Sequence, residues 1–277
     1  MKEIRIAVCL FGQLRTGLYC AEYIKEWYNL DSVTIGDSTY PVKIDFYCSV
    51  KDYNTNGHVA GKLFGQASIE MISQSELNQL FSIYNPVKSK IINHALDLIY
   101  YDKWVYLPMI TGLIDSILLK SRHELENNFV YDYCFCQRYD CLVHPIDSIK
   151  KVISRIDPGS VVAQYVHINA SEDGHVCMGD FWWAGDSLSI DLMAASLGRI
   201  QFINEKRHPP EFWYSGLGPN VCLYKCLLEN DVMVRTPNFG FDIVPVRPES
   251  DLTIPVLDSF LIHREFYAKN HPGLPKT

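Results

Sequence analysis

The chain has 277 residues, of which 48% are hydrophobic and 21% are charged, and its formal net charge is −7. This length and composition are typical of one large globular domain with its own core. The acidic balance disfavours a general nucleic-acid-binding surface, which requires clustered Lys and Arg.

The nine cysteines are scattered and lack the paired spacing of zinc sites. No apolar segment reaches the roughly 20 residues that span a bilayer, and the N-terminal apolar run is too short for a signal peptide. We therefore expect a cytoplasmic protein with reduced thiols.

The chain opens with a pattern that predicts a strand, a glycine-containing turn and a helix. Ile4–Phe11 is an apolar run of strand length, and it ends at Gly12–Gly17. The helix that follows has Tyr23, Ile24 and Trp27 on one face.

Predicted strands and helices alternate along the rest of the chain. The predicted strands are Lys43–Val50, Val87–Ile92, Val130–Gln137, Ser160–Val166, Phe181–Ala184 and Asp231–Arg235. The predicted helices are Ser73–Tyr84, Trp104–Asn127, Ile146–Ile156, one ending at Leu197, and Gly216–Glu229. Lys51–Gly65 and Ile168–His175 are polar and predict loops. This alternation favours an α/β fold with a mostly parallel sheet.

The segment Tyr131–Asp140 reads as a buried strand that ends in a cation and an anion. Since side chains alternate along a strand, Cys134 and Cys136 share one face with Arg138 and Asp140. Such a pair at the carboxyl end of a strand is typical of a ligand site in an open α/β sheet. The alternative is a strand capped by a surface salt bridge.

The turn Gly12–Gly17 lies before a helix, where backbone N–H groups suit an anionic ligand. Arg15 could add a bidentate phosphate contact. The dinucleotide and P-loop motifs are absent from the sequence, which disfavours those two classes. A purely structural turn with a solvated arginine is the alternative.

The segment Met178–Ser187 places Asp180 and Asp186 on either side of a short aromatic strand. Trp182 and Trp183 must point to opposite faces, so at most one can stack on a ligand, and both can equally belong to the core. Asp186 is better placed as a helix N-cap than as a catalytic group.

Two later residues are further candidates. Glu211 follows Pro209 and Pro210 at the start of a helical turn and could act as a general base, or could simply be stabilised by the helix dipole. His263 could fold back as a metal ligand or be a structural histidine. The serine-hydrolase and zincin motifs are absent.

The order of these motifs resembles that of GT-A-like nucleotide-sugar glycosyltransferases, including the WavE-type lipopolysaccharide synthesis proteins. The resemblance rests on IAVCLFGQLRTG, YDYCFCQRYD, MGDFWWAGDS and PPEFWYSGLGPNVCLYKCLLENDVMV, and it covers roughly residues 4 to 236. It implies a Rossmann-type, mixed but mostly parallel sheet with helices on both faces. It also implies a single domain over 1–277, with a nucleotide-binding half (1–140) and an acceptor half (141–277).

The resemblance further implies roles for individual residues. Gly12, Gln13 and Arg15 would contact the nucleotide diphosphate, and Arg138 and Asp140 would stand at the diphosphate and metal position. The remaining implied roles are catalysis by Asp180 and Glu211 and binding of Mn²⁺ or Mg²⁺ by Asp140 and His263.

The sequence departs from the family pattern at two points. Cys136 replaces the first arginine of R-x-R-x-D, and the usual D-x-D is absent because residue 138 is Arg. A metal-independent enzyme therefore remains open.

The expected reaction is sugar transfer from a nucleotide diphosphate donor to an acceptor hydroxyl on a polysaccharide or lipopolysaccharide precursor. One alternative is a phage-type transferase that modifies a hydroxymethylated DNA base, using a basic strip formed by Lys43, Lys51, Lys62, Lys103, Lys206 and Arg207. Another is a sugar-nucleotide-binding protein without catalysis.

Overall fold

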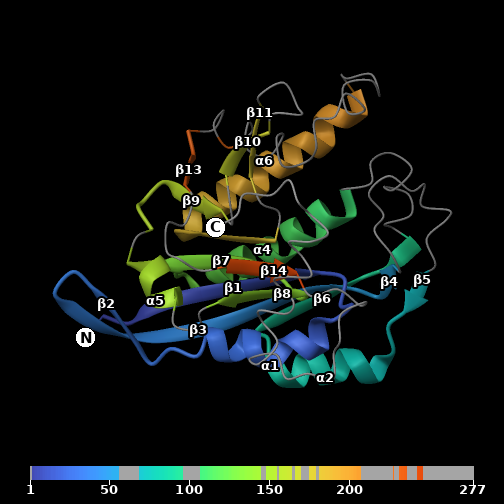
Figure 1. Ribbon diagram of the computed structural model, residues 1–277, viewed down its shortest axis with the longest axis horizontal. Coiled ribbons are helices and arrows are strands. Elements are labelled where there is room, and N and C mark those ends of the chain that lie inside the picture. Colours follow the sequence, from blue (N-terminus) through green and yellow to red (C-terminus); the bar gives the residue numbers. More distant parts are fainter. Residues whose placement is uncertain are drawn as a thin grey trace.

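The computed structural model describes residues 2–55, 69–95, 107–144, 148–154, 156–163, 166–169, 175–178, 181–206, 227, 231–235 and 242–245. Within these residues the chain forms a mixed α/β structure around one large sheet (Figure 1). The α/β class predicted from the alternating patterns is confirmed.

The strands and helices follow each other closely along the described chain. The strands are β1 (Ile4–Gly12), β2 (Ser32–Ile35), β3 (Ser38–Lys51), β4 (Tyr53–Thr55), β5 (Ile69–Met71), β6 (Lys88–Ile92), β7 (Tyr133–Arg138), β8 (Cys141–His144), β9 (Ser160–Ala163), β10 (Val166–Asn169), β11 (His175–Met178), β12 (Trp182–Gly185), β13 (Met233–Arg235) and β14 (Asp242–Pro245). The helices are α1 (Gly17–Trp27), α2 (Gln74–Tyr84), α4 (Leu107–Asn127), α5 (Ser148–Ile153) and α6 (Ser187–Lys206).

The main sheet has eight strands in the order β13-β9-β12-β7-β1-β3-β2, with β6 also paired to β3. β1 is parallel to both of its neighbours, β3 and β7. β12 is antiparallel to β7 and β9, and β2 is antiparallel to β3. β6 is parallel to β3, and β13 is parallel to β9. All strands of the sheet except β2 and β12 therefore run in the same direction, so the sheet is mixed but mostly parallel, as the sequence predicts.

The connections change direction at β1. The chain passes from β1 to β3 and β6 on one side, and then returns to β7 on the other side of β1. The carboxyl ends of β1 and β7 thus flank a topological switch point, where ligands bind in open α/β sheets.

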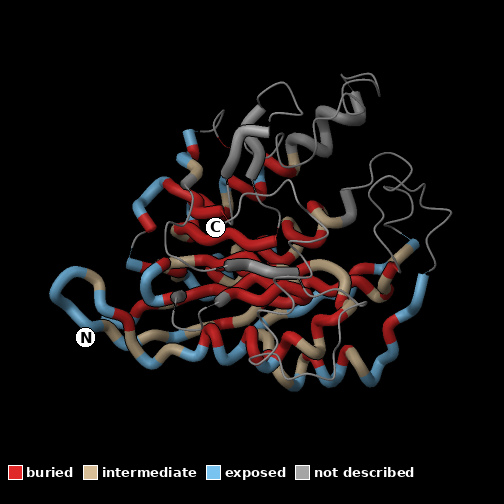
Figure 2. Tube along the Cα trace, in the orientation of Figure 1, coloured by how far each residue is buried: buried red, intermediate tan, exposed pale blue. Residues whose placement is uncertain are grey.

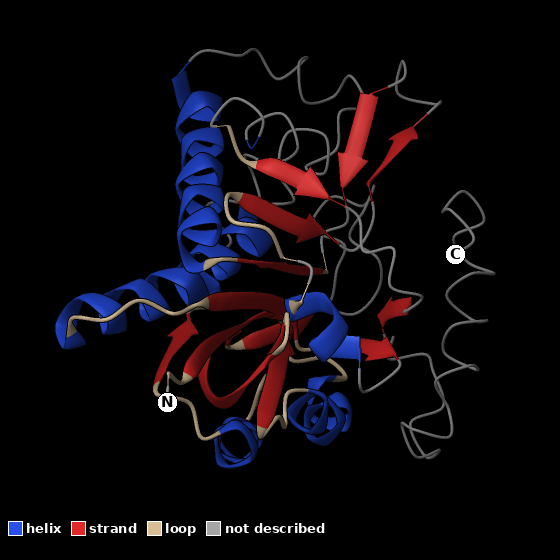
Figure 3. Ribbon diagram, turned by 90° about the vertical axis from the view of Figure 1, so that its left-hand side faces the viewer, coloured by secondary structure: helices blue, strands red, loops and turns tan. Residues whose placement is uncertain are grey.

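Two hydrophobic cores cover the two faces of the sheet. Val8 and Leu10 pack in the core that contains α1 and α2, whereas Cys9 and Phe11 pack in the core that contains α4 and α6. Figure 3 shows the sheet between its helices, and Figure 2 shows that the central strands are the most continuously buried part of the chain. This alternation is the period of two that an extended chain imposes.

Helix α2 begins and ends where the sequence predicts. Ser73 is its N-cap and forms a capping box with Glu76. The helix ends at Tyr84, since Asn85 takes a left-handed conformation (φ 46°) and Pro86 follows. The cap satisfies backbone N–H groups that the helix itself cannot pair.

A buried ionic network joins α4 to α6. Lys120 Nζ lies 3.0 Å from Glu124 Oε2 and 2.8 Å from Asp191 Oδ1, and it also donates to the Ser187 hydroxyl. Glu124 Oε1 accepts hydrogen bonds from Tyr131 N (2.8 Å) and Ser187 Oγ (2.7 Å). Lys120 is fully buried, so these partners replace the hydrogen bonds that water would otherwise make to its ammonium group.

Several of the predicted element boundaries are wrong; for example, the helix predicted to end at Leu197 continues to Lys206. The second strand begins at Ser38 rather than Lys43, because Gly36 (φ 58°) turns the chain and pairs β3 with β2. Ile168–His175, predicted as a loop, contributes to the antiparallel pair β10–β11. In the segment predicted as the loop Lys51–Gly65, Tyr53–Thr55 forms β4 and pairs with β5. These strands are only three or four residues long, which is too short for an apolar period to identify them.

Candidate functional site

The turn after β1 has an uncommon backbone geometry. Gly12 has φ 107°, which favours glycine, and Arg15 has φ 41°, in the left-handed region that other residues rarely adopt. Arg15 N donates a 2.7 Å hydrogen bond to Asn54 Oδ1, and this bond holds the turn against the segment that follows β3. Strained residues of this kind concentrate at functional sites.

Gly17 brings the start of α1 against the turn that follows β7. A Cβ at this position would lie 2.8 Å from Tyr139 Cβ and 2.9 Å from Leu14 Cδ1, closer than carbon atoms approach. The absence of a side chain therefore lets the Gly12–Gly17 turn approach Tyr139 and its neighbour Asp140.

Gln13 orients Arg15 within this turn. Gln13 Oε1 accepts hydrogen bonds from Arg15 Nε (2.8 Å), Thr55 N (3.1 Å) and Thr55 Oγ1 (3.0 Å). Arg15 Nη2 also donates to Thr55 Oγ1 at 3.4 Å. The guanidinium of Arg15 is thus fixed by Gln13, which follows β1, and by Thr55 at the end of β4.

Asp140 pairs with arginines from both strand ends. Arg138 donates in bidentate fashion, from Nε to Asp140 Oδ1 (3.0 Å) and from Nη2 to Oδ2 (2.7 Å). Arg15 Nη1 lies 3.6 Å from Asp140 Oδ2. The carboxylate is 1% exposed, whereas both guanidinium groups keep some contact with solvent.

Phe181 is a site residue that sequence reasoning missed. The Arg138 guanidinium carbon lies 4.7 Å from the centre of the Phe181 ring, and Arg138 N donates to Phe181 O at 3.0 Å. Cation–π contact and hydrogen bonding together fix the plane of the guanidinium. The signal in the sequence was the position of Phe181 at the start of the aromatic strand.

Lys51 is a second missed residue, and the prediction that placed it in an exposed basic strip is wrong. Lys51 is 2% exposed. Its Nζ donates to Thr111 Oγ1 at 3.4 Å, and its Cε lies 3.7 Å from the position of a Cβ on Gly112, beside Gly12 N. On β3, Lys51 lies on the same face as Tyr47, whose side chain packs in the α4–α6 core, and this position buries Lys51.

Arg15, Arg138 and Asp140 come together beyond the carboxyl ends of β1 and β7, and Lys51 lies at the carboxyl end of the neighbouring strand β3. Arg15, Arg138 and Lys51 carry three positive charges, and Asp140 carries one negative charge. The described part of the site therefore has an excess of positive charge, next to the N-terminus of α1. Both features favour a bound anion.

The surroundings of Asp140 do not fit a divalent cation. Both of its carboxylate oxygens accept hydrogen bonds from Arg138, and a metal ion would have to displace this guanidinium and approach that of Arg15. The other predicted metal ligand, His263, lies outside the described residues, as do the predicted catalytic residues Asp180 and Glu211.

The tryptophan pair and Asp186 have structural roles. Trp182 and Trp183 are fully buried on opposite faces of the sheet, so they belong to the core and neither is available for stacking on a ligand. Asp186 caps α6, since its Oδ1 accepts from Ser189 N at 2.9 Å. Burial raises the pKa of Asp186, but hydrogen bonds from Ser189 and Gly159 outweigh burial and lower it below its usual value.

In the described ranges, three cysteines form a group whose ligand atoms lie close enough to hold a metal ion: Cys9, Cys134 and Cys136. They lie inside β1 and β7, before the strand ends that form the anion site. Burial raises the pKa of the Cys9 and Cys136 thiols. At Cys134 burial also raises the pKa, but hydrogen bonds from the other two thiols and the Lys120 ammonium lower it overall.

No protein-family model and no curated protein matches this sequence. Among the described helices, none combines the length and the apolar character needed to cross a membrane.

Proposed function

We propose that this protein is a glycosyltransferase that moves a sugar from a nucleotide diphosphate donor to an acceptor hydroxyl. The observation that carries the proposal is the meeting of Arg15, Arg138 and Asp140 at the switch point between β1 and β7. The antiparallel strand β12 among parallel strands is compatible with the GT-A-like fold that the sequence motifs imply.

The site suits a diphosphate better than a single carboxylate ligand. Arg15 and Arg138 each present a planar guanidinium, which matches phosphate oxygens in bidentate fashion. Gln13 and Phe181 hold these two groups in fixed orientations, so little side-chain entropy is lost when an anion binds. Lys51 adds a buried positive charge behind Gly12.

In the proposed reaction, the bond between the anomeric carbon and the diphosphate oxygen breaks while the acceptor oxygen bonds to the same carbon. The diphosphate leaves with the bonding electron pair, and Arg15 and Arg138 stabilise the negative charge that develops on it. Asp140 keeps the two arginines in place. In an inverting enzyme, a carboxylate takes the acceptor proton, and the sequence motifs assign this role to Asp180 or Glu211.

The motifs favour a polysaccharide or lipopolysaccharide precursor as the acceptor, and the cysteine usage favours a cytoplasmic location. The alternative of a modified DNA base loses one support, because Lys51 is buried and cannot contact DNA from an exposed strip. Lys43 is another member of that strip, and its Nζ lies 3.6 Å from Asp45 Oδ2. Salt-sensitive binding to duplex DNA remains the observation that would favour this alternative.

The proposal is tested with a thermal-shift panel of nucleotide sugars and nucleoside diphosphates, with and without Mn²⁺. A ligand that binds only the native state raises the melting temperature. We expect at least one nucleoside diphosphate to do so without Mn²⁺. Arg15→Gln and Arg138→Gln should each weaken its binding about tenfold or more, because each removes a charge-assisted contact.

Lys90→Gln is the matched control, since Lys90 is an exposed cation on β6 that pairs with Asp115. It should bind the nucleotide as the wild type does. The proposal is wrong if no nucleotide stabilises the protein, or if Lys90→Gln weakens binding as much as the arginine variants. Release of nucleoside diphosphate from the bound nucleotide sugar separates an enzyme from a non-catalytic binding protein.

A further inference from the structure

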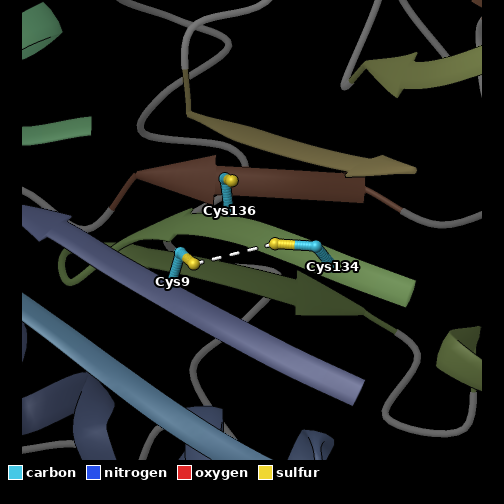
Figure 4. Close-up of side chains that lie close together, drawn as sticks. All are labelled: Cys9, Cys134 and Cys136. Carbon is cyan, nitrogen blue, oxygen red and sulfur yellow. Dashed lines mark hydrogen bonds between the residues drawn. The ribbon is translucent and has the colours of Figure 1, made fainter. Parts of the chain in front are cut away.

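Three cysteine side chains converge in the core between the sheet and helices α4 and α6. Cys9 lies on β1, and Cys134 and Cys136 lie on β7 (Figure 4). The Sγ atoms of Cys9 and Cys134 are 3.6 Å apart, and all three Sγ atoms lie within 4.8 Å of one another. All three residues are fully buried.

The three sulfur atoms lie closer together than the spacing of side chains on the strands would place them. Side chains two residues apart on one strand stand about 6.6 Å apart. The sulfurs of Cys134 and Cys136 nevertheless lie within 4.8 Å, so both side chains lean toward the same point. Three sulfurs around one ion, with metal–sulfur bonds of about 2.3 Å, would be about 4 Å apart. The Cys9–Cys134 distance of 3.6 Å, with all three sulfurs within 4.8 Å of one another, is compatible with this value.

A disulfide fits the pair Cys9 and Cys134 less well. Cys9 is the register partner of Cys136, and Cys134 is the partner of Ala7. The Cα atoms of Cys9 and Cys134 are therefore separated by one strand spacing and two residues, which is about 8 Å. A disulfide between residues more than about 7 Å apart requires backbone movement, and these two strands lie in the centre of the sheet.

We propose that Cys9, Cys134 and Cys136 form a three-coordinate site for one soft monovalent metal ion of the Cu(I) type. Sulfur ligands select soft ions, and a structural Zn²⁺ site has four ligands. In the described residues, the ligand group contains these three sulfurs alone. Each thiol that ligates the ion releases its proton to solvent.

The test is an anaerobic titration of the purified full-length protein with Cu(I) in competition with a chromophoric chelator. The site is buried, so the ion must enter by local opening or during folding; a second sample is therefore refolded in the presence of Cu(I). We expect one bound ion per chain in at least one of the two samples. Its X-ray absorption spectrum should show sulfur ligands at about 2.3 Å and a coordination number near three.

Cys9→Ala and Cys134→Ala should each lower the affinity for Cu(I) at least tenfold. Cys48→Ala is the matched control, because Cys48 is equally buried but packs in the other core, against α1 and α2. Failure of both samples to bind Cu(I), nitrogen or oxygen ligands in the spectrum, or an equal loss in Cys48→Ala would each overturn the proposal. The spectrum is measured on the wild type and so does not depend on the variants folding.

Discussion

Replacement of Lys120 by Met tests the ionic network between α4 and α6. The change keeps most of the side-chain volume but removes a fully buried ammonium. Glu124 is then left in the core without its cation, and Asp191 loses the same partner at a more exposed position. Breaking a buried ion pair by removing one partner costs about 3–5 kcal/mol.

The structure places the expected cost near the lower end of that range. Glu124 Oε1 keeps its hydrogen bonds from Tyr131 N and Ser187 Oγ, and these continue to solvate the carboxylate in part. We therefore expect Lys120→Met to lower the free energy of unfolding by about 3 kcal/mol. The free energy of unfolding of a domain is typically about 5–15 kcal/mol, so this loss is a large fraction of it.

The assay is urea unfolding followed by far-UV circular dichroism at pH 7. Adding Glu124→Gln to Lys120→Met should restore about 1 kcal/mol or more, because the amide oxygen keeps the acceptor and removes the uncompensated charge. If the single variant loses less than about 1 kcal/mol, or if Glu124→Gln deepens the loss, the network does not stabilise the fold in this way.

The pH dependence gives a second check. Burial lowers the pKa of Lys120, but the negative charges of Cys134, Asp191 and Glu124 outweigh burial and raise it above the usual value of 10.5. A raised lysine pKa contributes stability that is fully present below pH 10.5 and is lost as pH rises through the folded-state pKa. The difference between wild type and Lys120→Met should therefore persist from pH 7 to pH 10, roughly, and shrink at higher pH.

Three further substitutions test local features. Gly17→Ala should displace the start of α1 from Tyr139, with a loss of about 1–3 kcal/mol in urea unfolding and weaker nucleotide binding; unchanged binding would refute the packing argument. Ser73→Ala removes the capping box with Glu76 and should cost about 1 kcal/mol in thermal unfolding, with no effect on binding. Asp186→Ala should cost about 1 kcal/mol at pH 7. Because the pKa of Asp186 is lowered in the folded state, that cost should disappear as pH falls through the lowered value; a constant cost in acid would contradict the assignment.

The sequence predicted the parts of the fold that are determined locally. The apolar run of β1 and the capping signal at Ser73 identified their elements because each signal lies within a few consecutive residues. The alternation in β7 correctly placed Cys134 and Phe135 in different cores. These patterns have a period that does not depend on what packs against them.

The features that depend on contacts between distant segments could not be predicted in this way. Lys51 is buried because β3 lies beside β1 and under α4, and nothing adjacent to it in the sequence indicates that burial. Asp140 resembled a metal ligand, but its role depends on Arg15, which lies in a turn remote in the chain. Strands β10 and β11 are each four residues long, and such short segments are not identified by their apolar period.

The alternation of Trp182 and Trp183 provides a built-in optical readout. Although they are neighbours in the chain, they lie in different cores. The ring centroid of Trp182 lies 6.4 Å from that of Trp27 in one core, and the ring centroid of Trp183 lies 5.8 Å from that of Phe11, on which it stacks, in the other. Fluorescence from single-tryptophan variants would therefore follow the two layers of the protein separately during unfolding. Coincident fluorescence transitions of Trp182 and Trp183 would indicate that the protein unfolds as a unit, whereas separate transitions would indicate that one layer unfolds first.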